Sequence, residues 1–374
     1  MGHVLIAPDK FKGTLTAAQV AAHVAAGLDR ACPGLTYVQV PVADGGDGTV
    51  DAAQAAGYRR VELEVRGPAG QATRAAFAVR GRTVIIESAQ ACGLSKLPGG
   101  VPAPLTATSH GAGELISAAS RMGAGPIVVG LGGVACTDGG AGLVTALGAR
   151  LLDESGAELP PGGAALARLH RIDLSGLQDL SGTEVIAATD VDNPLLGERG
   201  AAAVYGPQKG ASAQDVTSLE NGLRRWSDVA EGTLGRRVRD EPGAGAAGGL
   251  GFALLAFLGA TTRPGIELML DLISFAGHLR GARLVITGEG ALDRQTLHGK
   301  APAGVARATA AAAPGVPVVA VAGMCSLTTD QLRAVGISAA YALTDLEPDL
   351  VRCRERAGPL LADLAARVGR DWIV

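Results

Sequence analysis

The stretch Val4-Leu-Ile-Ala-Pro-Asp-Lys-Phe-Lys-Gly13 decides the fold that we predict for this sequence. Its first four residues are apolar and predict a short buried strand, and the polar residues after them predict a loop at the carboxyl end of that strand. Thr16-Ala-Ala-Gln19 has the spacing of a capping box, which predicts a helix that continues to about Leu28. A strand, a loop and a helix in this order are typical of an α/β domain with a parallel sheet.

Four further apolar segments predict strands that join the first in one doubly wound sheet: Tyr37–Val42, Leu284–Thr287, Val316–Ala322 and Ala339–Leu343. Polar, glycine-rich loops follow two of them, Ala43-Asp-Gly-Gly-Asp-Gly-Thr49 and Gly288-Glu-Gly-Ala-Leu-Asp293. In such sheets, ligands bind outside the carboxyl ends of the strands. We therefore expect a ligand site along this edge.

The middle of the chain predicts an inserted second domain. It contains a hairpin-like pair, Val61–Val65 with Ala75–Val79, and three further strand patterns, Thr83–Glu87, Pro126–Leu131 and Glu184–Ala188. The expected fold is α/β with two domains. A doubly wound, flavodoxin- or Rossmann-like parallel-sheet domain of residues 1–65 and 275–374 is interrupted by a mixed α/β domain of residues 66–274.

The composition favours an enzyme that acts on small molecules. Lys+Arg 33 against Asp+Glu 36 gives a net charge of −3, and aromatic residues make up only 3%, so nucleic acid is not an expected partner. The longest uncharged stretch, Pro242 to Thr262, begins with too many glycines for a lipid-facing helix. The 5 cysteines are scattered without a Cys-x-x-Cys pair, and no secretory leader is visible. We expect a cytoplasmic protein with no membrane partner.

Lysine is rare in this sequence and is concentrated in loops. Of the 33 cationic side chains, only Lys10, Lys12, Lys96, Lys209 and Lys300 are lysine. All except Lys96 lie in glycine-bearing loops, a setting in which a compact ammonium neutralises a phosphate. Chance placement on exposed loops is the alternative for each of them.

Carboxylates gather in similar loops, and one pair has an informative spacing. If Thr189 to Asn193 is extended after its strand, Asp190 and Asp192 point the same way, so that both reach one Mg²⁺ or one binds the metal while the other accepts a proton. The alternative is that acidic residues cap turns and helices.

Two glycine-rich stretches are candidates for phosphate binding. Gly243-x-Gly245-x-x-Gly248 matches the dinucleotide fingerprint, but a charged segment and no strand precedes it, so we reject the Rossmann interpretation of this motif. The missing strand also counts against an NAD-linked oxidoreductase, which stays an alternative. An anion-binding turn before a helix and close helix packing both remain open for these glycines. Gly130-Leu-Gly-Gly133 with Thr137-Asp-Gly-Gly-Ala-Gly142 follows a clear strand and is the stronger candidate.

Seven segments together resemble the bacterial type-1 glycerate kinases, in order and over almost the whole chain. They are Ala7–Gly13, Ala43–Thr49, Gly132–Gly142, Asp190–Leu196, Gly206–Ala211, Pro242–Gly249, and Thr287–Asp293 with Gly299–Pro302. The sequence departs from that family at Lys10, Asp47, Val134 and Thr137, where members often carry Ser, Glu, Ser and Asn. At Val134 the lost hydroxyl leaves the backbone amides of that loop as the expected phosphate ligands.

The resemblance implies Mg²⁺-dependent transfer of the γ-phosphoryl group of ATP to D-glycerate, giving 2-phosphoglycerate, on two α/β domains. A kinase that forms 3-phosphoglycerate, a kinase of another small hydroxy acid, and a non-catalytic ligand-binding protein are the alternatives. A homo-oligomer is left open.

The expected site follows from this resemblance and from the residue types. We expect Asp190 to orient or deprotonate the substrate hydroxyl, Asp192 to bind Mg²⁺, and Lys12 and Lys209 to act in catalysis on the transferring phosphoryl group or the substrate carboxylate. The expected substrate-binding residues are Asp9, Lys10, Asp44, Glu289, Asp293 and Lys300. The expected nucleotide-binding residues are Gly132, Gly133, Asp138, Gly139 and Gly140.

Overall fold

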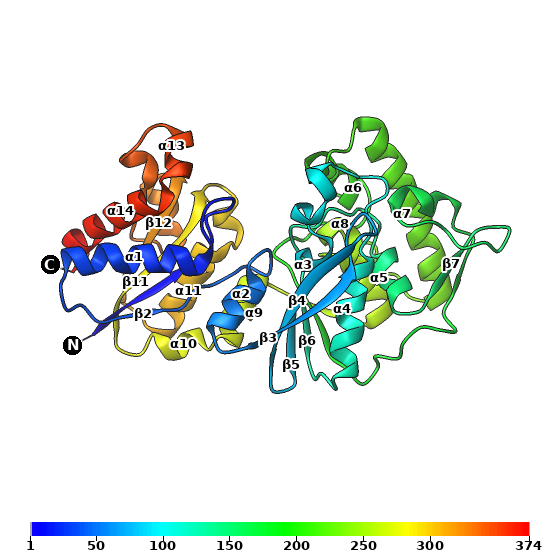
Figure 1. Ribbon diagram of the computed structural model, residues 1–374, viewed down its shortest axis with the longest axis horizontal. Coiled ribbons are helices and arrows are strands. Elements are labelled where there is room, and N and C mark those ends of the chain that lie inside the picture. Colours follow the sequence, from blue (N-terminus) through cyan, green and yellow to red (C-terminus); the bar gives the residue numbers. More distant parts are fainter. Residues whose placement is uncertain (1, 374) are drawn as a thin grey trace. The chain divides into compact units, whose positions relative to one another are not determined.

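The computed structural model describes residues 2–373, without the side chain of His298, and its chain divides into two compact units (Figure 1). Unit 1 consists of Met1–Asp44, Asp51–Gly57 and Pro264–Val374, and unit 2 of Gly45–Val50 and Tyr58–Arg263. Both are built from helices and largely parallel sheets, so the predicted α/β class is confirmed.

The units divide earlier along the chain than the boundaries after residues 65 and 274 that we expected from the sequence. The strand Arg59–Arg66 pairs along its whole length with the next strand of unit 2, and therefore belongs to that unit. Likewise, the helix Gly265–Leu272 contacts a helix of unit 1. The short segment Gly45–Val50 belongs to unit 2 although it is flanked on both sides by unit 1.

Unit 1 is built on a parallel sheet in the order β13-β12-β11-β1-β2. Its strands are β1 (His3–Pro8), β2 (Tyr37–Gln39), β11 (Ala282–Leu292), β12 (Val318–Cys325) and β13 (Ala339–Ala342). All of them were predicted, although β2 ends before Val42 and β11 continues to Leu292, through most of the segment Gly288–Asp293 that we expected to be a loop. Numbered along the chain within this unit, their order is 2-1-3-4-5, that of a flavodoxin-like sheet. The topological switch point of this sheet lies between β1 and β11.

Helices cover both faces of this sheet because the strands alternate their side chains. Val4 and Ile6 are fully buried in a cluster with residues of α1 (Ala17–Ala31) and α14 (Ala357–Trp372). The predicted capping box starts α1, where Thr16 accepts from Gln19 N. On the opposite face, α11 (Ala301–Ala312) contacts β1 and β11. The remaining helices of this unit are α9 (Gly265–Leu272), α10 (Phe275–His278), α12 (Thr329–Ala334) and α13 (Leu350–Glu355), while α2 (Thr49–Ala55) begins in the last residues of the Gly45–Val50 segment and continues into unit 1.

Unit 2 contains a mixed sheet in the order β10-β9-β6-β5-β4-β3. Its strands are β3 (Arg59–Arg66), β4 (Ala72–Arg80), β5 (Thr83–Glu87), β6 (Ile127–Gly130), β9 (Val185–Ala188) and β10 (Thr261–Arg263). The predicted hairpin β3–β4 is antiparallel, and β5, β6, β9 and β10 are parallel. Sequence analysis did not predict β10 or the small sheet of β7 (Arg150–Leu152) and β8 (Arg171–Asp173).

The apolar part of the long uncharged stretch is a core helix of unit 2, as predicted. It forms α8 (Ala246–Leu258), in which Leu250 and Leu254 are fully buried. Trp226 of α7 (Ala213–Leu234) packs edge-on against Phe252. The other α-helices of unit 2 are α3 (Ala89–Cys92), α4 (His110–Arg121), α5 (Ala141–Ala146) and α6 (Ala201–Tyr205). Among residues 2–373, none of the helices is long and apolar enough to cross a membrane.

Candidate active site

Three acidic side chains meet at the switch point of the unit 1 sheet. Asp9 directly follows β1, and its backbone N–H donates to the carbonyl of Gly288, one residue before Glu289 in β11 (2.8 Å). Asp44 follows the segment whose Val42 N–H donates to the Pro8 carbonyl (3.0 Å). The charge of Asp44 acts on both Asp9 and Glu289. The edge at which the sequence predicted a ligand site thus carries a cluster of carboxylates.

Asp9 is almost completely buried in this cluster. Burial raises its pKa to about 7, with smaller upward contributions from the charges of Asp44 and Glu289. Lys10 opposes the shift, since its Nζ lies 3.7 Å from Oδ1 of Asp9 and its backbone N–H donates to the same oxygen (2.7 Å). Asp9 therefore changes its protonation close to neutral pH.

Glu289 has the same character. Burial raises its pKa to about 7, against the hydrogen bond that the Thr296 hydroxyl donates to Oε1 and against Lys300, whose Nζ lies 3.8 Å from Oε2. Thr296 is fully buried and also accepts from the backbone N–H of Asp293 (3.1 Å). We did not single out Thr296 from the sequence, because a lone threonine in a polar loop gives no distinguishing signal.

The loop beyond β11 leads into a cavity of about 580 Å³. Its lining consists of Asp293, Arg294, Gln295, Ser326, Leu327 and Gln331, which come from the carboxyl-terminal sides of β11 and β12. Lys12 is exposed in the loop between β1 and α1. Four of the lysine and carboxylate positions predicted for this unit form two ion pairs at one edge, Asp9 with Lys10 and Glu289 with Lys300, and the charges of Asp9 and Glu289 act on each other.

In unit 2, Lys209 is buried at the end of a short turn, Pro207–Lys209. Its Nζ donates to the carbonyl of Cys136 (2.5 Å) and lies 3.4 Å from Oγ1 of Thr137. Within the described part of the chain, no carboxylate forms an ion pair with this ammonium. Burial lowers the pKa of Lys209, and electrostatic interactions with Cys136 and Asp138 oppose that shift.

The glycines of residues 243–249 form a tight turn against Lys209. Ala247, Gly248 and Gly249 are consecutively left-handed, with φ of 52°, 69° and 90°. A Cβ atom on Gly248 would lie 2.1 Å from the Cys136 carbonyl and 2.8 Å from Nζ of Lys209. No strand precedes this turn, in agreement with the rejection of a dinucleotide fold. The glycine at 248 is required for close packing on the lysine.

Asp138 lies inside the Gly130–Gly142 region, where we expected nucleotide contacts. It is fully buried and accepts from four internal donors: Ser109 N (2.8 Å), Ser109 Oγ (2.9 Å), Gly140 N (3.1 Å) and Gly142 N (3.2 Å). Gly139 is covered by Trp226, whose Nε1 donates to the Gly139 carbonyl (2.9 Å), and Gly140 packs on Ala253. These contacts fix the shape of the loop.

Gly132 and Gly133 lie against the second half of the Ala43–Thr49 motif. A Cβ atom on Gly132 would be 2.9 Å from Cα of Gly46, and one on Gly133 would be 2.2 Å from Oδ1 of Asp47. Gly133 also has a φ of 67°, which disfavours any other residue. The structure therefore brings Asp47 beside the glycine loop, a contact that the sequence did not predict.

The loop with Asp190 and Asp192 follows β9. Asp190 is half-buried, whereas Asp192 is exposed and its Oδ1 accepts from Arg199 (2.9 Å). Asn193 is held by Tyr205, whose hydroxyl donates to Oδ1 (2.6 Å). Across residues 2–373, no group of three or more His, Cys, Asp or Glu side chains is arranged to hold a metal ion.

Lysines, carboxylates and glycine-rich loops are parts from which phosphoryl-transfer sites are built. The model of the glycerate kinase family matches residues 4–373. The chain belongs to the glycerate kinase family, and it is an enzyme of the kinase class.

Similar proteins support this assignment over nearly the whole length. The chain is 44% identical over 372 residues to a glycerate kinase from Bacillus subtilis (strain 168), covering 98% of this chain and 96% of the relative. It is 44% identical over 345 residues to a glycerate 2-kinase from Escherichia coli (strain K12), covering 91% and 90%. A crystal structure of a candidate glycerate kinase 2 from Salmonella typhimurium LT2 superposes with a TM-score of 0.82 at 41% identity, covering 99% and 98%.

Proposed function

We propose that this protein transfers the γ-phosphoryl group of ATP to the C2 hydroxyl of D-glycerate, giving 2-phosphoglycerate, with Mg²⁺ as the metal. The 44% identity to the Escherichia coli glycerate 2-kinase supports this choice of substrate and product. Phosphoryl transfer depends on charge neutralisation and positioning more than on covalent chemistry. Lysines and carboxylates near the carboxyl ends of the strands can supply both, and this supports phosphoryl transfer.

The observation that carries the proposal is the environment of Lys209. An ammonium that is buried without a paired carboxylate is unfavourable, and it becomes favourable when an anion arrives beside it. Its neighbours are a backbone carbonyl, a hydroxyl and the glycine turn at Gly248. We assign Lys209 to the transferring phosphoryl group, where a positive charge stabilises the transition state.

Two sets of carboxylates are candidates for accepting the proton of the glycerate hydroxyl. Asp190 is the residue that the sequence favoured. Asp9 and Glu289 have pKa values raised to about 7, in the range that suits a general base at neutral pH. We keep Asp190 as the proton acceptor, and assign the unit 1 cluster of Asp9, Lys10, Asp44, Glu289, Asp293 and Lys300 to binding the substrate.

The residues present fit a magnesium ion that is shared with the nucleotide. A kinase site holds Mg²⁺ with one or two carboxylates and the substrate phosphates, so a complete cage of protein ligands is not required. Asp192, next to Asp190, would hold it, and the ion would neutralise charge on the phosphates. Gly132 and Gly133 are proposed to line the nucleotide phosphates through their backbone. Gly139 and Gly140 were expected to do the same, but they are buried and their N–H groups donate to the Gly248 carbonyl and to Asp138, so with Asp138 they are assigned to fixing the loop from inside.

An ADP-release assay with ATP, MgCl₂ and D-glycerate tests the function. We expect turnover that requires both glycerate and Mg²⁺. The ³¹P spectrum of the product distinguishes the regiochemistry, because a phosphate on C2 couples to one carbon-bound proton and a phosphate on C3 to two. If the phosphorus signal is coupled to two carbon-bound protons, the product is 3-phosphoglycerate and the proposed 2-phosphoglycerate is wrong. Turnover with another hydroxy acid but not with glycerate would overturn the substrate.

A further inference from the structure

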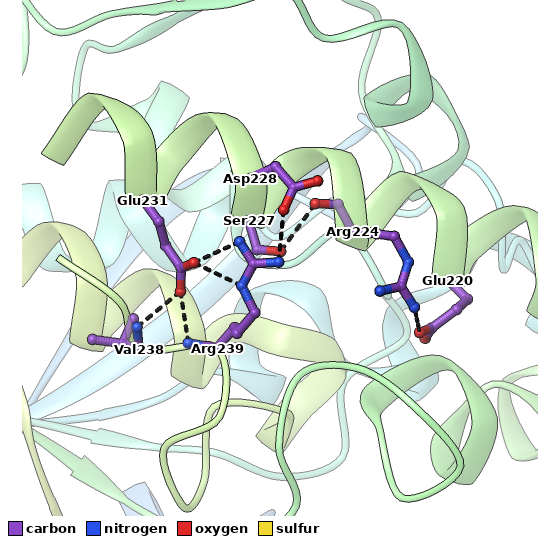
Figure 2. Close-up of polar contacts among 7 residues, drawn as sticks. All are labelled: Glu220, Arg224, Ser227, Asp228, Glu231, Val238 and Arg239. Atoms are coloured by element: carbon purple, nitrogen blue, oxygen red, sulfur yellow. Dashed lines mark hydrogen bonds and ion pairs between the residues drawn. The ribbon is translucent and has the colours of Figure 1, made fainter. Parts of the chain in front are cut away.

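An ion pair near the end of α7 fixes the segment that follows this helix (Figure 2). The helix ends at Leu234, the capping residue Gly235 after it is left-handed (φ 68°), and the chain returns toward Glu231. Oε1 of Glu231 accepts from the backbone N–H groups of Val238 (2.8 Å) and Arg239 (2.9 Å). Oε2 accepts from Nε of Arg239 (2.6 Å) and lies 2.5 Å from its Nη2. One carboxylate thus satisfies two backbone donors and the guanidinium together.

This pair is buried and well connected, unlike most ion pairs of the chain. The side chain of Glu231 is 5% exposed and that of Arg239 is 15% exposed. Burial alone would raise the pKa of Glu231, but the hydrogen bonds from Arg239 and Val238 outweigh it and hold the pKa below its ordinary value. Arg239 also donates through Nη1 to Asp228 (2.7 Å). Charge-assisted bonds of this kind hold a geometry more firmly than exposed pairs do.

The segment fixed by this pair is hydrogen-bonded to the loop that contains Asp190 and Asp192. The carbonyl of Arg239 accepts from the backbone N–H of Leu195 (2.8 Å), and Gly245 N donates to the Asn193 carbonyl (2.9 Å). A Cβ atom on Gly245 would lie 2.2 Å from the Pro194 carbonyl. The Asn193–Leu195 backbone is therefore held at two points by residues 239–245.

The same segment continues into the turn that covers Lys209. Only two residues separate Gly245 from Gly248, whose backbone packs on the Cys136 carbonyl and on Nζ of Lys209. The N–H of Gly139 donates to the Gly248 carbonyl (3.0 Å), which joins the turn to the Asp138 loop. The Glu231–Arg239 pair is thus connected to both the Asp190 loop and the Lys209 site, although it contacts neither Asp190 nor Lys209 directly.

We propose that Glu231 and Arg239 are a positioning pair for phosphoryl transfer: they set the backbone of the Asp190–Leu195 loop and of the Gly243–Gly249 turn together. This inference rests on the proposed function to the extent that Asp190 and Lys209 act in the reaction. Misplacement of reacting groups by about 1 Å reduces rates by up to roughly 10²-fold, so the effect of losing the pair falls on kcat.

The kinetic test compares Glu231→Gln and Arg239→Lys with two control variants in the same unit. Glu231→Gln removes the charge that attracts the guanidinium, and we expect kcat to fall by roughly tenfold or more with KM for ATP changed by less than about threefold. Arg239→Lys keeps a charge and both backbone bonds to Glu231, so we expect a partial recovery of kcat. Arg150→Gln breaks an exposed ion pair with Glu158, and Leu151→Ala truncates a buried side chain in β7.

The controls separate positioning from general destabilisation. We expect Arg150→Gln to have the kcat and Tm of the wild type. We expect Leu151→Ala to have a lower Tm but the kcat of the wild type. The positioning role is overturned if Glu231→Gln keeps kcat within twofold of the wild type. It is also overturned if Leu151→Ala, at a Tm equal to that of Glu231→Gln, loses as much kcat as Glu231→Gln does.

Amide hydrogen exchange tests the pair without any substrate. In Glu231→Gln we expect faster exchange at Leu195 and Gly245 than in the wild type, and unchanged exchange in β3 and β4. Unchanged exchange at both amides would overturn the inference even if glycerate is confirmed as the substrate. Faster exchange in a protein that does not phosphorylate glycerate would retain the structural coupling and overturn the proposed function alone.

Discussion

The two units hold charge in opposite ways. In unit 1, Asp9 and Glu289 are buried side by side at a sheet edge, with pKa values raised to about 7 and with Lys10 and Lys300 in contact. In unit 2, a single ammonium, Lys209, is buried among backbone groups with no carboxylate paired to it in the described chain. A cluster that titrates near neutral pH is suited to binding the substrate or, as the alternative to Asp190, to accepting its proton, whereas a buried ammonium is suited to holding an anion. The predictions below test this division.

The largest expected effect is that of Lys209→Met. We expect kcat to fall by roughly 10³-fold, because the variant removes the charge that we assign to the transferring phosphoryl group. We expect Tm to be unchanged or raised, because methionine fills similar space without a buried ammonium. Lys96→Met is the matched control, since Lys96 is only half-buried and its Nζ donates to the Arg74 carbonyl (3.0 Å), away from the residues proposed for the site. Activity of Lys209→Met within tenfold of the wild type would contradict the assignment.

The second prediction decides which unit accepts the proton. Asp190→Asn should lower kcat by roughly 10²-fold or more while leaving the Mg²⁺ requirement largely unchanged. Glu289→Gln should instead act mainly on KM for glycerate. Steady-state kinetics of the two variants give both values. The opposite pattern would move the proton acceptor from the unit 2 loop to the unit 1 cluster.

The third prediction concerns the metal. Asp192→Asn should raise the Mg²⁺ concentration needed for half-maximal rate, with part of the activity recovered at high Mg²⁺. Because Asp192 pairs with Arg199 across an exposed surface, its loss should leave Tm nearly unchanged. A Mg²⁺ titration and a thermal melt measure the two effects. If Asp192→Asn needs no more Mg²⁺ than the wild type, Asp192 does not bind the metal and its role is the ion pair with Arg199.

The fourth prediction uses the raised pKa of Asp9. A carboxyl group whose folded-state pKa is raised from 3.8 to about 7 stabilises the fold below pH 4, and this contribution is lost as the pH rises toward 7. Asp9→Asn removes this dependence, so the variant should be more stable than the wild type at pH 8, by up to about 4 kcal/mol, and nearly equal to it at pH 4. Urea unfolding at both pH values measures the difference. Lower stability of the variant at pH 8 would show that Lys10 and its neighbours neutralise Asp9 more completely than its burial indicates.

The smallest expected effect is at Ala247, the non-glycine residue within the left-handed turn. Ala247→Gly should raise the free energy of unfolding by about 0.5–1 kcal/mol, because alanine is strained at a φ of 52°. The exposed helical Ala310→Gly should lower it by about 1 kcal/mol. If Ala247→Gly is destabilising by as much as Ala310→Gly, the turn relaxes when nothing is bound.

The sheet of unit 1 could be predicted from the sequence because each strand is a short apolar run that ends in a polar loop. Val4–Ala7 and Leu284–Thr287 pair as neighbours, and this pairing places Asp9 beside Glu289. By contrast, β10 is Thr261-Thr-Arg263, largely exposed, and a three-residue polar strand has no pattern that separates it from a loop. Local pattern therefore predicts buried strands and fails for short edge strands.

For the candidate site, the sequence indicates residue types but not contacts. The lysines and carboxylates were found because their loops are rich in glycine, but the four donors around Asp138 include Ser109, which is 29 positions away in the chain. Whether an aspartate in a glycine loop faces a ligand or the interior depends on such distant donors. Glu231 and Arg239 likewise belong to no sequence motif. Their proposed role is visible only from the backbone groups that they hold in the folded chain.

The pairing of β1 with β11 also sets a schedule for synthesis of the chain. Ala7 and Thr287, which share a hydrogen bond, are separated by 280 positions. At a translation rate of about 5–20 residues per second, the first strand waits roughly 14–56 s for this neighbour to leave the ribosome. All of unit 2 emerges during that interval, and its sheet can close first. The nascent chain must therefore keep an apolar amino-terminal strand from aggregating until its carboxyl-terminal neighbours arrive.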